Sequence, residues 1–258
     1  MSGVPQIFDT RLRRRRRERA VRAFDAFSFL AAAARDEIGE RLAAVNRTFE
    51  RVVWHGAVTP PAGPIGWVHS DSAFGFVPAG GLAFEEERLP FGAQTLDLFA
   101  SAMTLHAVND LPGALAQIRR CLKPGGLFMA AMPGGRTLHE LRLALGEAEI
   151  ETTGGLSPRV APFADVRDTG ALLQRAGFVQ PVADADLSTV RYEHPLILLR
   201  DLRGMGEANA LSERRRMFLR RGVLARACEI YVQKFAGADG RVPATFEVIY
   251  LTGWAPGP

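Results

Sequence analysis

The chain has 258 residues, of which 47% are hydrophobic, 9% aromatic and 23% charged, and its formal net charge is +4. These proportions are typical of a soluble globular protein and exclude wholesale disorder, collagen-like repeats and a disulfide scaffold. Its two cysteines, Cys121 and Cys228, lack metal-ligand spacing and favour a reducing cytoplasm, and no apolar run approaches the roughly 18 residues of a membrane-spanning helix.

The first predicted element is an arginine-rich helix. Residues 11–22 hold eight arginines and one acid, a local charge of +7 that leaves the remainder of the chain at −3. Such segregation indicates a local contact and disfavours a uniformly cationic nucleic-acid binder. Three interpretations stay open. The arginines form a solvated face that pairs with nearby acids, or Arg13, Arg14 and Arg15 contact RNA, an acidic lipid surface or an acidic protein. The third, a transit peptide, is disfavoured by Asp9 and Glu18.

The next elements alternate between helix and strand. A second amphipathic helix is predicted over 28–48, with five side chains facing inward: Phe29, Leu30, Ile38, Leu42 and Val45. The pattern then predicts strands at 52–54, 65–68, 95–101, 127–131 and 246–251, and helices at 111–122, 137–149 and 168–176. This alternation is typical of an α/β protein with a mostly parallel, doubly wound sheet.

Several segments carry a family resemblance. Residues 95–98, 105–110 and 122–126 resemble the fourth strand, its loop and the turn before the fifth strand of class I S-adenosylmethionine (SAM) methyltransferases. A narrower set resembles the methyltransferase-like assembly factors of respiratory complex I: residues 8–14, 134–138, 154–158, 162–163, 201–209 and 242–245. The best-known branch of that family is similar to an arginine hydroxylase acting on a complex I subunit. The malonyl-carrier methyltransferases of the biotin pathway are more distant relatives.

The resemblance implies a fold, a cofactor and a partner. It implies a Rossmann-like methyltransferase domain over 49–258, preceded by an arginine-rich helical extension over 1–48. A helical insertion at about 190–240 should act as a lid, SAM should be the cofactor, and a complex I subunit should be the partner. Because the chain begins almost at its Phe8–Asp9 element, it resembles a bacterial cytoplasmic member.

The segment from 50 to 84 departs from the family pattern. A SAM site needs an acidic strand end followed by a glycine-rich turn, but here only Gly56 remains, after the bulky Trp54 and His55. Eight residues, 57–64, separate Gly56 from the next predicted strand, whereas a crossover through a helix needs a dozen or more. Three of the eight are prolines, which cannot lie inside a helix. The sequence therefore predicts a truncated first half of the sheet and an eroded cofactor loop.

Four residues are the candidates for contact with SAM if it binds: Gly56, Asp71, Glu85 and Glu86. Asp71 ends the second predicted strand, where the family holds the ribose hydroxyls, and lies one position out of register. Glu85 and Glu86 match the acidic position near the adenine, or are simply solvated. His106, beyond the fourth strand, is the candidate catalytic residue, as a general base or a hydrogen-bond donor to a substrate. The alternative is that it packs the loop and caps the next helix with Asn109 and Asp110.

Other residues are candidates for partner or substrate contact. Arg136 follows the fifth strand, where it could hold an anionic group or simply form a turn. Met205, Glu207 and Asn209 lie in an irregular segment that the resemblance assigns to a lid or partner surface. No zinc spacing, iron facial triad, P-loop or nucleophile elbow occurs, so no metal is predicted.

Three functions therefore compete. The first is a methyltransferase-like protein with a degenerate cofactor loop that acts through a protein partner in complex I assembly. The second is an active SAM-dependent methyltransferase, or a SAM-linked arginine hydroxylase, with an unusual pocket. The third is an RNA-binding module that uses Arg11 to Arg22, and its binding should depend steeply on salt.

Overall fold

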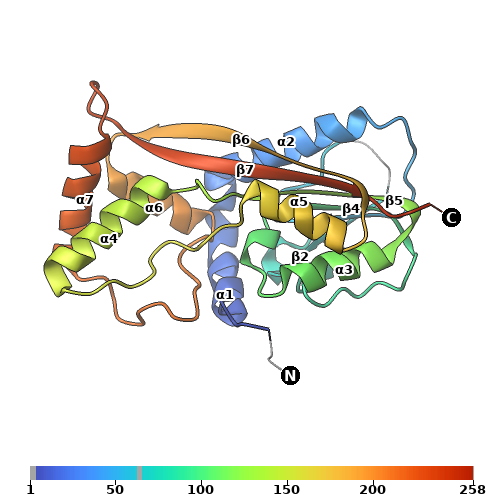
Figure 1. Cartoon of the computed structure of the whole chain (residues 1–258), viewed down its shortest axis with the longest axis horizontal. Helices are drawn as coiled ribbons and strands as arrows, with labels where there is room; N and C mark the ends of the chain where they lie inside the picture. Colours follow the sequence, from blue (N-terminus) through green and yellow to red (C-terminus); the bar gives the residue numbers. More distant parts are fainter. Residues whose placement is uncertain (1–3, 63–65, 258) are drawn as a thin grey trace.

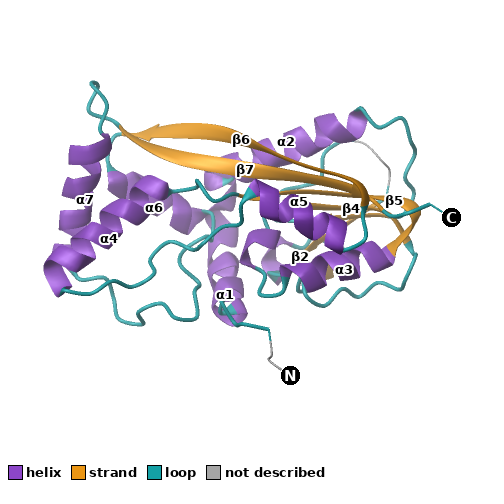
Figure 2. Cartoon of the chain, in the orientation of Figure 1, coloured by secondary structure: helices purple, strands orange, loops and turns teal. Residues whose placement is uncertain are grey.

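The computed structural model describes residues 4–62 and 66–257, which form a seven-stranded sheet with helices on both faces (Figures 1 and 2). The strands are β1 (Val52–His55), β2 (Trp67–Asp71), β3 (Leu82–Ala83), β4 (Leu96–Ala102), β5 (Leu122–Pro133), β6 (Val179–Tyr192) and β7 (Val242–Trp254). The α-helices are α1 (Thr10–Ala20), α2 (Phe29–Ala43), α3 (Leu111–Cys121), α4 (His139–Thr153), α5 (Val166–Arg175), α6 (Pro195–Gly204) and α7 (Arg221–Phe235). Short 3₁₀ helices are η1 (Val21–Phe27), η2 (Phe74–Phe76) and η3 (Leu105–Ala107).

The strand order β3-β2-β1-β4-β5-β7-β6 confirms the predicted doubly wound α/β sheet. Strands β1 to β5 run parallel, while β7 is antiparallel to both β5 and β6. The carboxyl ends of parallel strands meet at one edge of a sheet, and ligands bind outside that edge in open α/β folds. In register, His55 at the end of β1 lies opposite Ser70 on β2 and Ser101 on β4.

Each face of the sheet has its own hydrophobic core. Helices α3 and α5 pack on one face, where Leu115, Ile118 and Leu173 are buried against Phe99 and Phe128. Helix α2 packs on the other, through Ala34, Ile38 and Leu42, against side chains of β1, β4 and β5. The inward positions predicted for Ile38 and Leu42 are confirmed. Leu30 and Val45 are partly buried against the same core, although the helix ends at Ala43, before Val45. Phe29 is 40% exposed, so its inward assignment was wrong.

The first half of the sheet is truncated, as predicted. Among residues 56–62 and 66, which connect β1 to β2, there is no helix, and β2 to β3 is joined by the single turn η2. The Trp54 indole donates to the carbonyl of Val58 at 2.7 Å, so the connection folds back onto its own strand. Strand β2 begins at Trp67, and Ile65, which was predicted to start it, lies outside the described residues.

The predicted C-terminal insertion is present between β6 and β7. Helices α6 and α7 pack with α4 around Leu141, Leu198, Ile230 and Tyr231, beyond one end of the sheet (Figure 1). The long antiparallel pair of β6 and β7 leads to it, and β6 was not predicted because its polar edge-strand sequence lacks an apolar run. Over 4–62 and 66–257, no helix has both the length and the apolar character needed to cross a bilayer.

Candidate functional site

Helix α1 contributes two arginines to the carboxyl edge of the sheet. Asp9 caps the helix by accepting a hydrogen bond from the Leu12 amide at 3.0 Å. Arg13 and Arg17 are four residues apart, which places both on one helix face. They are only 5% and 3% exposed, so a solvated helix face is the wrong description for this pair. Arg14 and Arg15 are exposed, with Arg14 lying 3.4 Å from Glu85.

Arg17 joins Asp71 to the loop that follows α6. Its Nη2 lies 2.5 Å and its Nε 3.4 Å from the two carboxylate oxygens of Asp71, while its Nη1 lies 3.2 Å from Glu207. The Ala73 amide also donates to Asp71, at 2.8 Å, and the Phe76 ring centroid is 5.2 Å from the guanidinium carbon. Asp71 is fully buried, and both of its oxygens are engaged within the chain.

Arg13 forms a similar ion pair with Glu86. Its Nη1 lies 3.1 Å from the Glu86 carboxylate and its Nη2 donates to the carbonyl of Thr104 at 3.1 Å. His55 approaches the same carboxylate at 3.4 Å, and its other ring nitrogen lies 3.0 Å from the Ser70 hydroxyl. Glu86 is therefore buried between two groups of the chain and is not solvated.

His106 contacts the loop that follows α6, which covers the site and is called the lid below, and it does not cap α3. Its Nε2 lies 3.0 Å from Glu207, and its side chain is 5% exposed. The helix cap is Asp110, which accepts from the Gly113 amide at 2.8 Å, while Asn109 accepts from the Phe8 amide. The buried Nδ1 of His106 has no hydrogen-bond partner within the part of the chain that the structure describes. The capping role expected for this histidine was wrong.

Ion pairing lowers the pKa of two carboxyl groups of this cluster, those of Glu207 and Glu86. Burial alone would raise the pKa of Glu207, but His106, Arg13 and Arg17 lower it to about 2. Burial is likewise outweighed at Glu86, whose pKa Arg13 and His55 hold well below its usual value. Glu85 behaves differently, because burial and the neighbouring Glu86 raise its pKa. Two guanidinium groups thus face three carboxylates, those of Asp71, Glu86 and Glu207, at the carboxyl edge.

Gly56 lies where β1 and β4 approach each other closely. Its φ is 154°, and a Cβ built there would come within 2.6 Å of the Ala102 carbonyl oxygen. Its amide donates to the carbonyl of Ser70 at 2.9 Å, and its own carbonyl lies 2.7 Å from His69 Nε2. Two residues of β2, Ser70 and His69, therefore engage both backbone polar groups of this glycine.

The partner or substrate candidates divide into two groups. Met205, Glu207 and Asn209 lie on the loop after α6 that covers the site, and Asn209 donates to the carbonyl of Pro158 at 2.8 Å. Arg136 is exposed, lies apart from that loop and binds Glu247 through its backbone amide. Arg17 was missed as a site residue. The spacing Arg13, Arg17, Ala20, Phe24 could have revealed it, because it continues into a buried apolar face.

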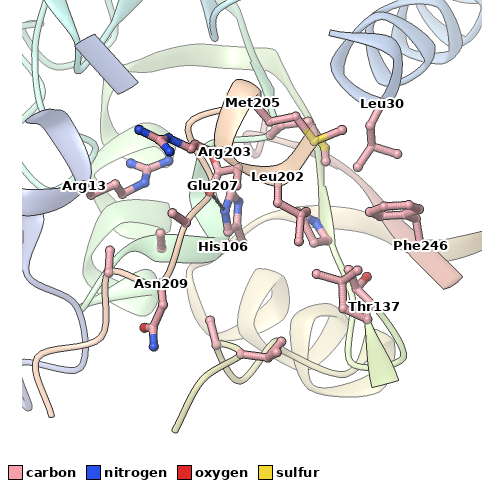
Figure 3. A pocket seen from close by; sticks show the side chains of 18 of the residues that line it. Arg13, Leu30, His106, Thr137, Leu202, Arg203, Met205, Glu207, Asn209 and Phe246 are labelled. Atoms are coloured by element: carbon pink, nitrogen blue, oxygen red, sulfur yellow. Dashed lines mark hydrogen bonds and ion pairs between the residues drawn. The ribbon is translucent and has the colours of Figure 1, made fainter. Parts of the chain in front are cut away.

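A cavity of about 300 Å³ adjoins the ionic cluster. Figure 3 shows Arg13, His106 and Glu207 toward one side of it and Leu30 and Phe246 toward the other. A mostly apolar cavity with a few convergent polar groups is the usual form of a small-ligand site. Within residues 4–62 and 66–257, no group of three or more His, Cys, Asp or Glu side chains could hold a metal ion.

Comparisons with known proteins identify the family. A profile described as a methyltransferase domain matches residues 80–130. Arginine-hydroxylase NDUFAF5, mitochondrial, of Danio rerio is 45% identical over 180 residues, which cover 70% of this chain and 56% of that protein. The human NDUFAF5 is 46% identical over 178 residues, covering 69% and 51%. The chain belongs to the class I SAM-dependent methyltransferase superfamily.

Further relatives fit this superfamily. The malonyl-acyl-carrier-protein O-methyltransferase of Xylella fastidiosa is 37% identical over 168 residues, covering 65% of this chain and 55% of that protein. The chain spans about half the length of the curated relatives it matches.

Solved structures show the class I methyltransferase fold. Bacillus YcgJ matches with a TM-score of 0.55 at 11% identity, covering 85% of this chain and 98% of that one. A Haemonchus contortus phosphoethanolamine N-methyltransferase, bound to S-adenosylhomocysteine, matches with a TM-score of 0.51 at 12% identity, covering 93% and 58%. The cyclase SpnF also matches, with a TM-score of 0.50 at 17% identity over 86% and 82%. The fold therefore hosts more than one activity.

Proposed function

We propose that this methyltransferase-superfamily member acts through a protein partner and that internal ion pairs replace its SAM site. The observation that carries the proposal is the engagement of Asp71 by Arg17 at 2.5 Å and 3.4 Å. Asp71 ends β2, so it is the acid placed to hold a ribose, yet its oxygens bind the chain itself. The residues as arranged do not fit SAM.

The energetic argument supports the same proposal. Removing one partner of a buried ion pair costs about 3–5 kcal/mol, because a charge is left buried without compensation. A ligand that displaced Arg17 from Asp71 would have to overcome a cost of that kind. Glu86 is held in the same way by Arg13, and the polar groups of Gly56 bind the sheet and His69. Three of the four candidate cofactor contacts are thus already occupied.

The proposed partner is a complex I subunit, and the proposed process is complex I assembly. Support comes from the resemblance of residues 201–209 and 242–245 to the assembly-factor family and from 45% identity to NDUFAF5. In the structure, residues 205–209 form the loop over the site, and this loop is the surface proposed to meet the partner. We propose a bacterial cytoplasmic location, whereas the NDUFAF5 proteins are named as mitochondrial.

Calorimetry with SAM and S-adenosylhomocysteine tests the proposal. Wild-type protein should give no binding heat up to millimolar ligand. A micromolar dissociation constant, about −8 kcal/mol, would overturn it. The double variant Arg17→Leu/Asp71→Asn serves as the control, since it removes both charges of the pair and the candidate ribose contact. If wild type binds SAM and this variant does not, the ligand occupies the Asp71 site.

An arginine-directed activity is the second candidate. The supporting observation is that Asp71, Glu207 and Phe76 surround the guanidinium of Arg17, a set of groups suited to holding an arginine side chain. The relatives named as arginine hydroxylases favour it as well. Mass spectrometry of complex I subunits from cells with and without this protein provides the test. An arginine modification that depends on the protein would favour this activity, and its absence would count against it.

RNA binding is the weakest of the proposals. The buried positions of Arg13 and Arg17 remove two arginines from any nucleic-acid surface. An RNA-binding role would require affinity that falls steeply with salt and with charge-reversing changes at the exposed Arg11 and Arg15.

A further inference from the structure

The segment between α6 and α7 carries an exposed aromatic side chain among arginines. Residues 213–221, which we call the arginine loop, comprise the end of this segment and the first residue of α7; they read Glu-Arg-Arg-Arg-Met-Phe-Leu-Arg-Arg and have a net charge of +4. Phe218 is 99% exposed and Met217 is 63% exposed. Leu219, the next residue, lines the cavity beside the ionic cluster. The loop therefore covers the cavity on one side and presents large apolar side chains to solvent on the other.

A second loop, which connects α4 to α5, adds apolar surface beside the arginine loop. Glu149 near the end of α4 binds Arg159 at 2.6 Å and the Ser157 hydroxyl at 2.7 Å, and it lies 3.6 Å from Arg215. Leu156, adjacent to Ser157, is 69% exposed. The two loops run at the lower left of Figure 1, below α4. Exposed apolar side chains from both loops thus share one region.

The exposed arginines of α1 extend the positive charge of this region. Arg214 lies 3.3 Å from Asp9, and the Ser212 amide donates to the carbonyl of Ile7 at 2.8 Å. These contacts place the arginine loop beside the start of α1, whose Arg11 and Arg15 are exposed. The outcome is a basic surface with an apolar centre.

We propose that the arginine loop docks on the surface of an anionic phospholipid bilayer. Phe218 and Met217 insert at the boundary between headgroups and acyl chains, while Arg216 and Arg220 bind phosphates. Apolar side chains ringed by arginines are the usual composition of peripheral membrane-binding segments. Phe218 is 99% exposed, so almost no other side chain packs against it. Such a side chain is better placed to insert into a lipid layer than to fill a preformed pocket on a protein. Docking there brings the lid and its cavity to the membrane surface.

Vesicle flotation with the full-length protein tests this proposal. The protein should bind vesicles of phosphatidylcholine mixed with phosphatidylglycerol and should not bind phosphatidylcholine alone. The variant Met217→Ala/Phe218→Ala removes the two inserted side chains. It should lower the partition coefficient between vesicles and water at least about tenfold, because the apolar area of both side chains is no longer buried in the bilayer. Arg216→Gln/Arg220→Gln should lower it about thirtyfold, five- to sixfold per arginine. These side chains are exposed, so both variants should fold.

Matched controls separate docking from general charge or hydrophobicity. Leu187→Ala removes an exposed apolar side chain from β6, and Arg167→Gln/Arg175→Gln removes two exposed arginines from α5. Both should keep wild-type binding. Binding that is equal on neutral vesicles, or that responds to the controls as strongly as to the loop variants, would overturn the proposal. So would the absence of binding to the anionic vesicles, whether or not the protein binds RNA.

Discussion

Arg17 and Asp71 are 54 residues apart in sequence, yet their side chains form a bidentate pair at 2.5 Å and 3.4 Å at the carboxyl end of β2. The pair ties the N-terminal helix to the sheet edge, and Glu207 ties the same guanidinium to the lid. Three parts of the chain therefore meet at one buried arginine. Helix α1 is therefore a structural component of the site. Loss of the helix should destabilise the whole fold.

Breaking this pair should cost far more than breaking an exposed pair of the same helix. Arg17→Leu leaves Asp71 buried without its cation, so the free energy of unfolding should fall by about 3–5 kcal/mol. Arg14→Leu breaks the partly exposed pair with Glu85 and should cost less than about 1 kcal/mol. Urea denaturation measures both. If Arg17→Leu/Asp71→Asn is no more stable than Arg17→Leu, the buried charge is not the cause of the loss.

The ionic cluster predicts a loss of stability in acid. Glu207 has a pKa of about 2, against an ordinary value of 4.5, because His106 and the arginines outweigh its burial. A carboxylate whose pKa is lower in the folded state stabilises the protein above the unfolded value, and that contribution disappears as pH falls toward the folded value. The free energy of unfolding should therefore decrease between pH 4.5 and about 2.

A glutamine variant measures how much of that pH dependence comes from Glu207. Glu207→Gln removes the titrating group, so its stability should fall less steeply with decreasing pH than that of the wild type. Glu193→Gln changes a carboxylate that is 76% exposed and should leave the slope unchanged. Urea denaturation at a series of pH values provides the measurement. Equal slopes for wild type and Glu207→Gln would contradict the depressed pKa.

Gly56 should not tolerate even one extra methyl group. A Cβ at this position would meet the Ala102 carbonyl oxygen at 2.6 Å, which forces β1 and β4 apart. Gly56→Ala should therefore destabilise the protein by more than about 1 kcal/mol. Gly222, in the first turn of α7, has open space around its Cβ position, so Gly222→Ala should stabilise by about 0.5–1 kcal/mol. Thermal unfolding of the two variants should shift in opposite directions.

The sequence predicted the fold better than the site. The alternation of apolar runs and helix signals located strands β1, β2, β4, β5 and β7 and helices α3, α4 and α5, whereas the two-residue strand β3 was not predicted because both of its side chains are exposed. The short, proline-rich connection after Gly56 predicted the truncated half because chain length alone excludes a helix there. Strand β6 was not predicted, because an exposed edge strand needs no apolar run.

The site was only partly predictable because its partners come from distant segments. Asp71, Glu86 and Glu207 were candidates by position, but the side chains that neutralise them are on α1. A run of arginines does not indicate which two face inward. That choice follows from the apolar positions Ala20 and Phe24 farther along the chain, which set the buried face. Ion pairing across long sequence separations leaves no local pattern.

Glu207 should control how tightly the lid closes over the cavity. Its two oxygens bind Arg17 at 3.2 Å and His106 at 3.0 Å, so one side chain fastens the loop after α6 to both α1 and the sheet edge. Glu207→Gln keeps the size of the side chain and removes the charge that holds both contacts. Amides of residues 205–212 should then exchange with solvent faster, because local opening costs less free energy.

Hydrogen exchange with mass spectrometry measures this opening, and two comparisons locate its cause. Glu213→Gln alters an exposed carboxylate in the next turn of the same loop and should leave exchange at 205–212 unchanged. His106→Ala removes one of the two contacts of Glu207 and should give an intermediate effect, since Arg17 still holds the carboxylate. Faster exchange across the whole protein in Glu207→Gln would indicate global destabilisation, and exchange equal to wild type would show that other lid contacts, such as that of Asn209 with Pro158, keep the loop closed.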